Sequence, residues 1–231
     1  MSLPQLRCGQ AKLCALTADP SGVIWQALAP TWLLDTVSSE TPRQRTWVKV
    51  AHDETELRVL FHAEDTEVWA THTQRDALLY EEEVVEIFLD PVGDLNGYFE
   101  IEVNPLNAVL DLVLRRSRSG WKRNFAWQCE GLQTAVRLWS GNGEAKSSRL
   151  IDASSIGIPE TLAEANAWSA ELSIPFASIS SVPPARDWRV NFYRIDRPKT
   201  PLDSPRELSA WSPTGAPNFH VPERFGYLHL E

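Results

Sequence analysis

The chain has 231 residues, of which 43% are hydrophobic, and a formal net charge of −9. This negative charge argues against general nucleic-acid binding, because affinity for phosphate requires clustered Lys and Arg. No apolar run is long enough to span a membrane, so we expect neither nucleic acid nor a membrane as a partner. Its 10 Trp and 16 Pro, with short runs interrupted by Pro, favour a β-sandwich over a helical bundle. We therefore predict one all-β domain over residues 1–231.

The first part of the chain predicts an arm followed by a hairpin. Residues 1–24 have no clear period, and we expect an irregular arm or a short edge strand there. Residues 24–34 are apolar but interrupted by Pro30, which favours a short turn and a strand over one helix. Alternating side chains then predict a hairpin with strands at residues 46–50 and 56–62.

Residues 63–79 are polar and carry several acidic side chains. They indicate a solvated loop or, alternatively, a calcium site, because hard cations bind several oxygens on a bent loop. The D-x-D-x-D-G spacing of a common calcium loop is absent, so the sequence does not assign the ligands.

The clearest signal is a second hairpin, which we expect to organise the fold. From Val84 to Asp90 apolar side chains occupy every second position, and Pro91 ends this strand. A cluster of Gly, Asp and Asn predicts the turn into a second strand at residues 98–104. One face of this hairpin is apolar. The other carries several carboxylates, which no core would accept unpaired, so we expect it to meet solvent or a ligand.

The rest of the chain contains further short strands separated by turns. The predicted elements are a strand at 109–114, a basic turn at 115–120, a strand pair at 127–139, a long connection at 147–166 with a helical turn near 160–165, a strand at 168–174, a helical turn at 176–179 and a strand at 188–195. This spacing predicts an antiparallel β-sandwich with jelly-roll-like or immunoglobulin-like layering and one short helical turn.

The three cysteines, Cys8, Cys14 and Cys129, match no zinc pattern. Cys8 and Cys14 would pair in an oxidising compartment, and three reduced thiols are the alternative. The first residues lack the basic and apolar regions of a signal peptide, which indicates a cytoplasmic protein. A secreted or periplasmic location is expected instead if an export signal has been removed.

Several stretches, taken in order, resemble the family 9 carbohydrate-binding modules and the wider, DOMON-related group of sandwich domains. They are E-E-V-V-E-I-F-L-D-P, G-Y-F-E-I-E-V-N-P, W-S-A-E-L-S-I-P-F, W-R-V-N-F-Y-R-I-D and W-S-P-x-x-x-x-x-F-H-V-P-E-R-F-G-Y-L, and they span residues 45–231. The resemblance implies a β-sandwich that holds a sugar, often by its reducing end, with structural calcium in some members. It implies binding rather than hydrolysis.

In sugar-binding members of that family, two aromatic rings sandwich one pyranose, whose C–H faces pack on flat rings while its hydroxyls form hydrogen bonds. By motif position, Tyr80 and Phe219 stand where the rings are expected, and Glu86 keeps the acidic position. Glu102 stands where an arginine is expected and Tyr193 where an amide is expected; such an acidic face would suit an amino sugar. The candidate ligand-binding residues are Tyr80, Glu86, Glu102, Tyr193, Arg194 and Phe219.

Each candidate also has a structural interpretation. Tyr80 would equally cover one end of the sandwich, and Phe219 would equally pack in the core or a turn. Adjacent glutamates on one face repel unless a cation or hydroxyl donors lie between them, so Arg194 and Arg197 would make them a structural ion-pair cluster.

Other functional classes are less consistent with the sequence. A glycoside hydrolase would use paired carboxylates, for which Glu86 and Glu102 are the candidates. A haem-binding domain of this type would need an axial methionine, and Met1 is the only one. A sandwich that has lost ligand binding is a further alternative. We therefore expect a non-catalytic protein with no cofactor beyond a structural calcium.

Overall fold

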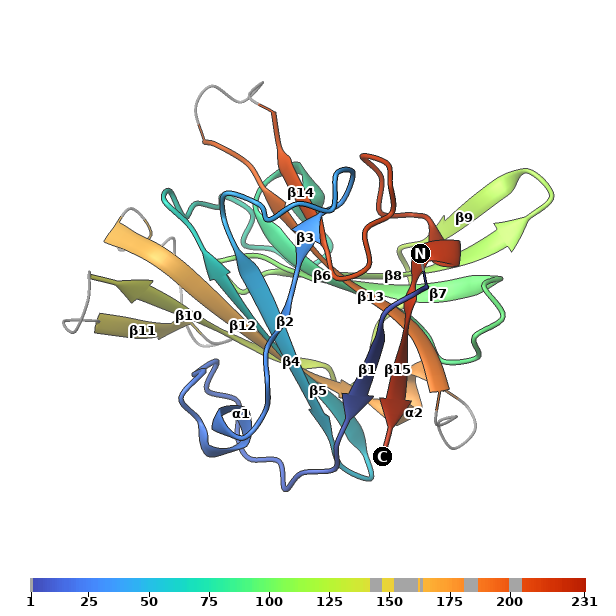
Figure 1. Ribbon diagram of the computed structural model, residues 1–231, viewed down its shortest axis with the longest axis horizontal. Helices are drawn as coiled ribbons and strands as arrows, with labels where there is room; N and C mark the ends of the chain where they lie inside the picture. The colour runs from blue at the N-terminus through green and yellow to red at the C-terminus, as the bar shows by residue number, and fades with distance from the viewer. Residues whose placement is uncertain (1, 142–146, 152–161, 163, 181–186, 200–204) are drawn as a thin grey trace.

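Two packed β-sheets form the molecule. The computed structural model, shown in Figure 1, describes residues 2–141, 147–151, 162, 164–180, 187–199 and 205–231. Strands dominate these ranges and form two sheets, which confirms the predicted all-β sandwich. None of the helices in these ranges is long and apolar enough to cross a membrane.

The larger sheet joins nine of the described strands. They are β1 (Gln5–Cys8), β3 (Leu34–Asp35), β6 (Val84–Asp90), β7 (Gly97–Val103), β8 (Val109–Ser117), β9 (Gly120–Asn124), β13 (Asp187–Asp196), β14 (Glu207–Ala210) and β15 (Gly226–Leu230). Their order is β1-β15-β13-β6-β7-β8-β9, and β14 pairs with both β13 and β3. The pairing of β1 with β15 is parallel, so segments near the two chain ends lie side by side at one edge (Figure 1).

The smaller sheet is antiparallel and has six described strands in the order β11-β10-β12-β5-β4-β2. They are β2 (Thr31–Trp32), β4 (Thr46–His52), β5 (Glu56–Glu64), β10 (Gln133–Ser140), β11 (Ser147–Ile151) and β12 (Ala165–Pro175). Short helical turns connect some of the strands. They are α1 (Val23–Gln26), η1 (Leu79–Glu81), α2 (Phe176–Ile179) and η3 (Pro222–Arg224).

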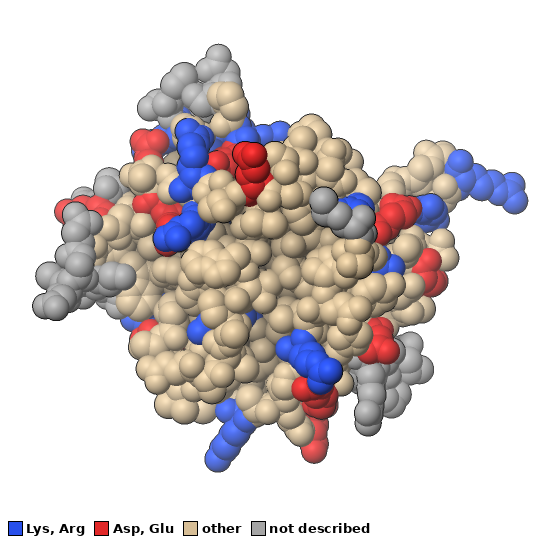
Figure 2. Space-filling view, in the orientation of Figure 1, with Lys and Arg blue, Asp and Glu red and all other residues tan. Residues whose placement is uncertain are grey.

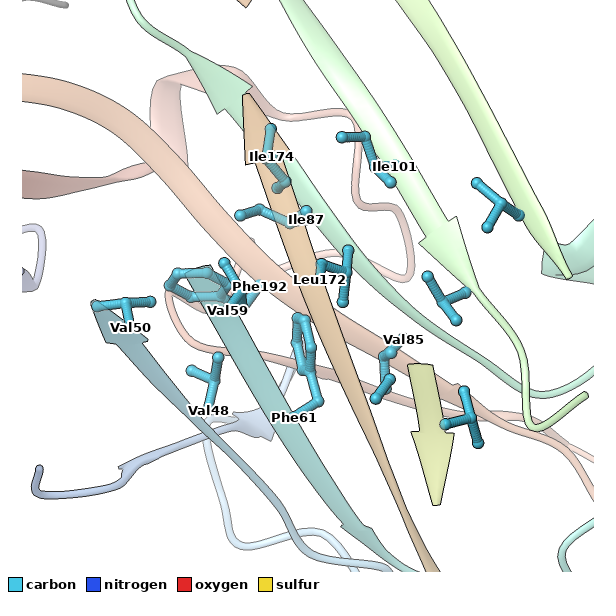
Figure 3. Close-up of a cluster of buried hydrophobic side chains, with 14 of the residues drawn as sticks. Val48, Val50, Val59, Phe61, Val85, Ile87, Ile101, Leu172, Ile174 and Phe192 are labelled. Atoms are coloured by element: carbon cyan, nitrogen blue, oxygen red, sulfur yellow. The ribbon is translucent and has the colours of Figure 1, made fainter. Parts of the chain in front are cut away.

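The main core lies between the two sheets. Figure 3 shows Val59 and Phe61 from the smaller sheet pointing toward Ile87 and Phe192 from the larger one. The rings of Phe61 and Phe192 meet edge to face with centroids 5.9 Å apart. Burying each such side chain contributes about 1.5–3 kcal/mol, so this layer accounts for much of the stability of the sandwich.

The central hairpin forms as predicted. Strands β6 and β7 are antiparallel, with Glu86 directly opposite Glu102. The strands predicted at 46–50, 56–62, 168–174 and 188–195 and the helical turn at 176–179 are likewise confirmed, with slightly wider strand limits.

Three predictions from the middle of the chain need correction. Residues 115–120 are not one turn, because β8 continues to Ser117 and β9 begins at Gly120. This edge ribbon is largely solvent-exposed, so its sequence lacks the apolar alternation of a half-buried strand. The strand pair predicted at 127–139 is a single strand, β10. Gly131 lies just before β10 and has a φ of +76°, so the chain turns there and no first strand forms. Residues 147–151 form β11 within the predicted connection, and the helical turn near 160–165 lies largely outside the described residues.

The cysteines are all free thiols. Cys8 is buried, and burial raises its pKa to about 12, while Cys14 is exposed. Cys8 and Cys14 are therefore not paired in the structure, which agrees with the alternative of reduced thiols.

The outer face of the larger sheet carries a second apolar layer. Phe88, Tyr98, Leu112 and Tyr193 are buried there together with Phe225. Every residue of β6 is buried, because its inner side chains enter the main core and its outer ones enter this second layer. The glutamates of the hairpin thus lie among apolar side chains and not on an open surface.

Charged side chains are dispersed on the face of the molecule seen in Figure 2. Lys and Arg lie at separate positions near the edge of this view, several of them beside Asp or Glu. On this face they do not gather into one basic patch, in keeping with the charge of −9.

Candidate functional site

A cavity of about 200 Å³ opens on the outer face of the larger sheet. It is bounded by the turn at Tyr80, by strands of the sheet and by the loop at residues 217–220. Its lining residues are Tyr80, Glu86, Glu100, Leu112, Arg123, Phe125, Ile195, Arg206, Leu208, Pro217, Asn218, Phe219 and His220. Pockets for drug-sized ligands measure about 300–1,000 Å³, so this cavity suits a single small ring.

Three glutamates form the floor of the cavity and the layer beneath it. Strand alternation puts Glu86 of β6 and both Glu100 and Glu102 of β7 on the same face of the sheet. Glu86 and Glu100, which line the cavity, are 2% and 4% exposed, and Glu102 beneath them is 0% exposed. Carboxylate oxygens of all three lie within 4.8 Å of one another. We call these residues the glutamate triad.

The glutamate triad has too few polar partners for its charge. Oε1 of Glu86 and Oε2 of Glu100 are buried without a hydrogen-bond partner. Burial raises the pKa of Glu100 to about 7. Burial, and then the neighbouring glutamates, raise the pKa values of Glu86 and Glu102 well above the ordinary range. Ionisation of the triad is therefore less favourable than that of free glutamates unless a donor or a cation enters the cavity.

Two arginines stand at the rim of the cavity. Nη1 of Arg206 donates to the backbone oxygen of Tyr80 at 3.3 Å, and Nη2 of Arg123 lies 3.1 Å from Nε2 of His220. Both arginines are exposed. Among the described residues, neither forms an ion pair with the glutamate triad, although Arg123 lowers the pKa of Glu100 and Arg206 that of Glu86.

His220 closes one side of the cavity as a neutral ring. It stacks on Phe88 with centroids 5.4 Å apart, and its Nδ1 lies 2.7 Å from the hydroxyl of Tyr98. Because Arg123 can only donate, Nε2 must accept, which leaves the proton on Nδ1 to be donated to Tyr98. Burial and then Arg123 lower the pKa of His220 to about 4.

Tyr193 supports the cavity from below. Its ring stacks on Phe219 with centroids 4.2 Å apart, and its hydroxyl donates to the backbone oxygen of Phe219 at 3.0 Å. Asn191 donates to the same hydroxyl at 2.8 Å. Tyr193 is 0% exposed and does not line the cavity, so it positions the loop that carries Phe219.

The predicted placement of Arg194 at this cavity is corrected by the structure. Arg194 follows Tyr193 in β13 and therefore points to the opposite face of the sheet. Its guanidinium donates to Asp65 and to the backbone oxygen of Glu64, both at 2.6 Å, which ties the larger sheet to the end of β5. Arg197 donates to the backbone oxygen of Glu81 at 2.6 Å. Neither arginine joins the glutamate triad as the predicted ion-pair cluster requires.

Of the predicted site residues, Tyr80, Glu86 and Phe219 line the cavity, with Glu102 directly beneath. The sequence analysis missed Phe125, which is 41% exposed on the rim, and the rim arginines. Phe125 follows β9, a strand that was not predicted because its residues are mostly polar. Glu100, which the strand alternation predicts on the same face as Glu86 and Glu102, also lines the cavity.

A second acidic cluster lies at the end of the sandwich near the loop that follows β5. Oxygens of Asp65, Glu83 and Asp196 lie within 4.8 Å of one another, and Oε2 of Glu83 is buried without a partner. Burial, and then Asp65, raise the pKa of Glu83 well above its ordinary value. Arg194 compensates part of this charge through Asp65 and Asp196. A net negative set of carboxylates with a free oxygen fits a hard cation such as calcium.

Comparison with known proteins places this geometry in context. The model of the family described as carbohydrate-binding family 9 matches residues 34–230. A candidate carbohydrate-binding protein from Bacteroides uniformis ATCC 8492 is 20% identical, with a TM-score of 0.68 and 100% of each chain covered. A carbohydrate-binding module of family 9 from Caldicellulosiruptor kristjanssonii is 15% identical; its cellotriose complex has a TM-score of 0.63 over 99% of this chain and 94% of that one. Its glucose complex has a TM-score of 0.64 over 99% and 96%. No curated protein matches the chain.

Proposed function

Because the chain belongs to carbohydrate-binding family 9, we propose that its cavity binds one sugar ring at the end of a carbohydrate. The observation that carries this proposal is the composition of the cavity, which combines aromatic side chains with buried carboxylates in about 200 Å³. A pyranose presents the complementary surface, because its C–H faces are apolar and its hydroxyls are polar.

The aromatic contacts are supplied mainly by Tyr80 and Phe125. Phe125 is 41% exposed and Tyr80 is half-buried, so both rings can be covered by a ligand. Phe219 is only 7% exposed, and Tyr193 covers one of its faces. The resemblance implies that Tyr80 and Phe219 hold the sugar. We propose instead that Phe125, and not Phe219, makes the larger contact with the sugar opposite Tyr80.

The polar contacts are divided between the floor and the rim of the cavity. Glu86 and Glu100 offer acceptor oxygens to sugar hydroxyls on the floor. Arg123, Arg206 and Asn218 offer donors at the rim. A sugar hydroxyl can therefore donate a hydrogen bond to the floor and accept one from the rim.

Binding without hydrolysis is favoured by the placement of the carboxyl groups. A glycosidase needs two carboxyl groups on either side of the scissile bond, about 5–9.5 Å apart. The glutamate triad instead forms one cluster on one side of the cavity, and Glu102 is 0% exposed and does not line the cavity. Release of the aryl group from aryl glycosides, above the rate of a Glu86→Gln variant, would contradict a purely binding role.

Titration calorimetry with glucose and cellotriose tests the proposed site. Replacing Tyr80 or Phe125 by Ala should each weaken binding about two- to tenfold, because one stacked ring contributes about 0.5–1.5 kcal/mol. Trp32→Ala is the matched control, since Trp32 is an aromatic residue that is 43% exposed and lies in the smaller sheet. Equal affinities in the two cavity variants and the control would place binding elsewhere, and no binding of either sugar would remove the proposal for these ligands.

We further propose that Asp65, Glu83 and Asp196 hold a structural calcium ion. The support is the mutual proximity of their carboxylates and the unpartnered oxygen of Glu83. Asp65 and Glu83 border the polar segment after β5, so a cation there would tie that segment to β13.

A further inference from the structure

The floor of the cavity carries buried carboxyl oxygens that the protein leaves without hydrogen-bond partners. Glu86 and Glu100 line the cavity, and each has one buried oxygen without a partner. Glu102 lies beside Glu86 on the neighbouring strand, and its carboxyl group shares a hydrogen bond with that of Glu100. Buried polar groups are normally paired, so these oxygens indicate that a ligand group completes them.

The chemistry of that group follows from the number and type of acceptors. A sugar hydroxyl supplies one proton and no charge, and therefore leaves most of the triad unpaired. A primary ammonium supplies three donors and one positive charge, and the carboxyl groups of Glu86 and Glu100 line the place it would occupy, with Glu102 next to them. A charge-assisted hydrogen bond of this kind is roughly twice as strong as a neutral one.

We infer that the cavity selects a sugar that carries a primary ammonium group, with the ammonium on the glutamate triad and the ring between Tyr80 and Phe125. This inference rests on the proposed sugar site and specifies its ligand class. The pKa values of Glu86 and Glu100 are raised although Arg206 and Arg123 lower them, so these exposed arginines do not offset the burial of the carboxyl groups.

The depth of the charged groups in the cavity argues against an anionic ligand. The two arginines at the cavity are exposed at the rim, with Arg206 held by the backbone of Tyr80 and Arg123 by His220. The carboxyl groups are the deep ones, at 4% exposure or less. A ligand with its charged group buried must therefore bring a cation to the floor, while its hydroxyls reach the arginines.

A bare divalent cation satisfies the site less completely. Calcium takes six to eight oxygen ligands, and of the glutamate triad only Glu86 and Glu100 line the cavity, whereas Asp65, Glu83 and Asp196 all line the pocket at the other acidic cluster. An ammonium group needs only the acceptors that are present.

Calorimetry with a matched series of sugars tests the inference. Glucosamine, glucose and N-acetylglucosamine share one ring, and only glucosamine carries a cation at about pH 6.5, where an ordinary amine is protonated. The intact protein should bind glucosamine at least tenfold more tightly than glucose or N-acetylglucosamine. Glu100→Gln should reduce this ratio severalfold, whereas Glu54→Gln, which changes an exposed glutamate in the β4–β5 turn, should leave the ratio unchanged.

The possible outcomes are distinguishable. If glucose binds as tightly as glucosamine, the ammonium assignment is wrong and the sugar site stands. If none of the three sugars binds, the proposed sugar site fails for these ligands and the inference falls with it. A calcium titration provides the last arm: calcium binding that is lost in Glu102→Gln, without any preference for the amine, would assign the triad to a metal.

Discussion

At the scale of single residues, Glu102 is the most unusual group in the molecule. It lies in the middle of a sheet with 0% exposure, and two further glutamates, Glu86 and Glu100, lie beside it. Such a group reduces the stability of the empty protein when it ionises. A binding protein can tolerate this cost when the same group contributes to its ligand.

The pH dependence of stability follows from this placement. A carboxyl group whose pKa is raised by folding contributes stability that is fully present below its unfolded value near 4.5 and is lost as the pH rises through the folded value. For Glu100 most of this loss falls between about pH 4.5 and 7, and Glu86 and Glu102 add a loss in the same direction above pH 4.5. His220, with its pKa lowered to about 4, acts in the opposite direction between about pH 4 and 6.5.

Glu102→Gln should therefore stabilise the empty protein above about pH 7, where only the carboxyl groups still lose stability. The free energy of unfolding of the variant should exceed that of the wild type, and the difference should grow as the pH rises. Urea unfolding at several pH values measures it. A variant that is less stable than the wild type across this range would show that Glu102 is paired in the folded protein.

At the scale of elements, the loop after β14 depends on a close contact beneath it. Trp211 donates its backbone N–H to Phe192 at 2.9 Å, and its ring lies over Gly226 at the start of β15. A Cβ atom on Gly226 would lie 2.5 Å from Trp211 and 2.8 Å from the backbone oxygen of Pro4. Glycine is therefore required for β15 to pass under this ring.

Gly226→Ala should lower the free energy of unfolding by about 1–3 kcal/mol, as overpacking of a dense core does. Gly9→Ala is the control, because a Cβ atom there would meet nothing within 4 Å. Thermal unfolding of both variants measures the difference. Equal stabilities would mean that Trp211 moves freely.

The predictability of each element depended on how much of it is buried. Strands β6, β12 and β13 were foreseen because one or both faces enter the core and their apolar residues alternate or cluster. The ribbon β9 was missed because its residues are mostly exposed, and Arg123 was hidden with it. Arg194 was misplaced because sequence spacing does not show which face of β13 borders the cavity.

At the scale of the whole molecule, the fold was more predictable than the site. Strand periods and turns are local signals, and they indicated the sandwich that the structure confirms. The cavity instead gathers Tyr80, Glu86, Phe125, Arg206 and Phe219 from segments far apart in the chain. Long-range pairing of strands brings them together, and composition alone does not show it.

The proposed calcium ion should also act on the whole molecule. A ligand held only by the folded state stabilises by about 2.7 kcal/mol at a hundredfold excess over Kd, which raises the Tm of a chain of this size by roughly 5–10 °C. Scanning calorimetry after EDTA treatment and after calcium readdition measures this shift. The shift should be lost in Glu83→Gln and kept in Glu54→Gln. A Tm that does not respond to calcium in the wild type would remove the metal site.

The most direct test of the account is a crystal structure of the protein with glucosamine or glucose bound. The account predicts one sugar ring between Tyr80 and Phe125, with the amine or a hydroxyl of the sugar on Glu86 and Glu100. A second groove on the protein, lined by Phe99 and Trp127, provides an alternative location within the same crystal. Sugar density in that groove, or on any other surface, with the cavity at Tyr80 left empty would contradict the central claim.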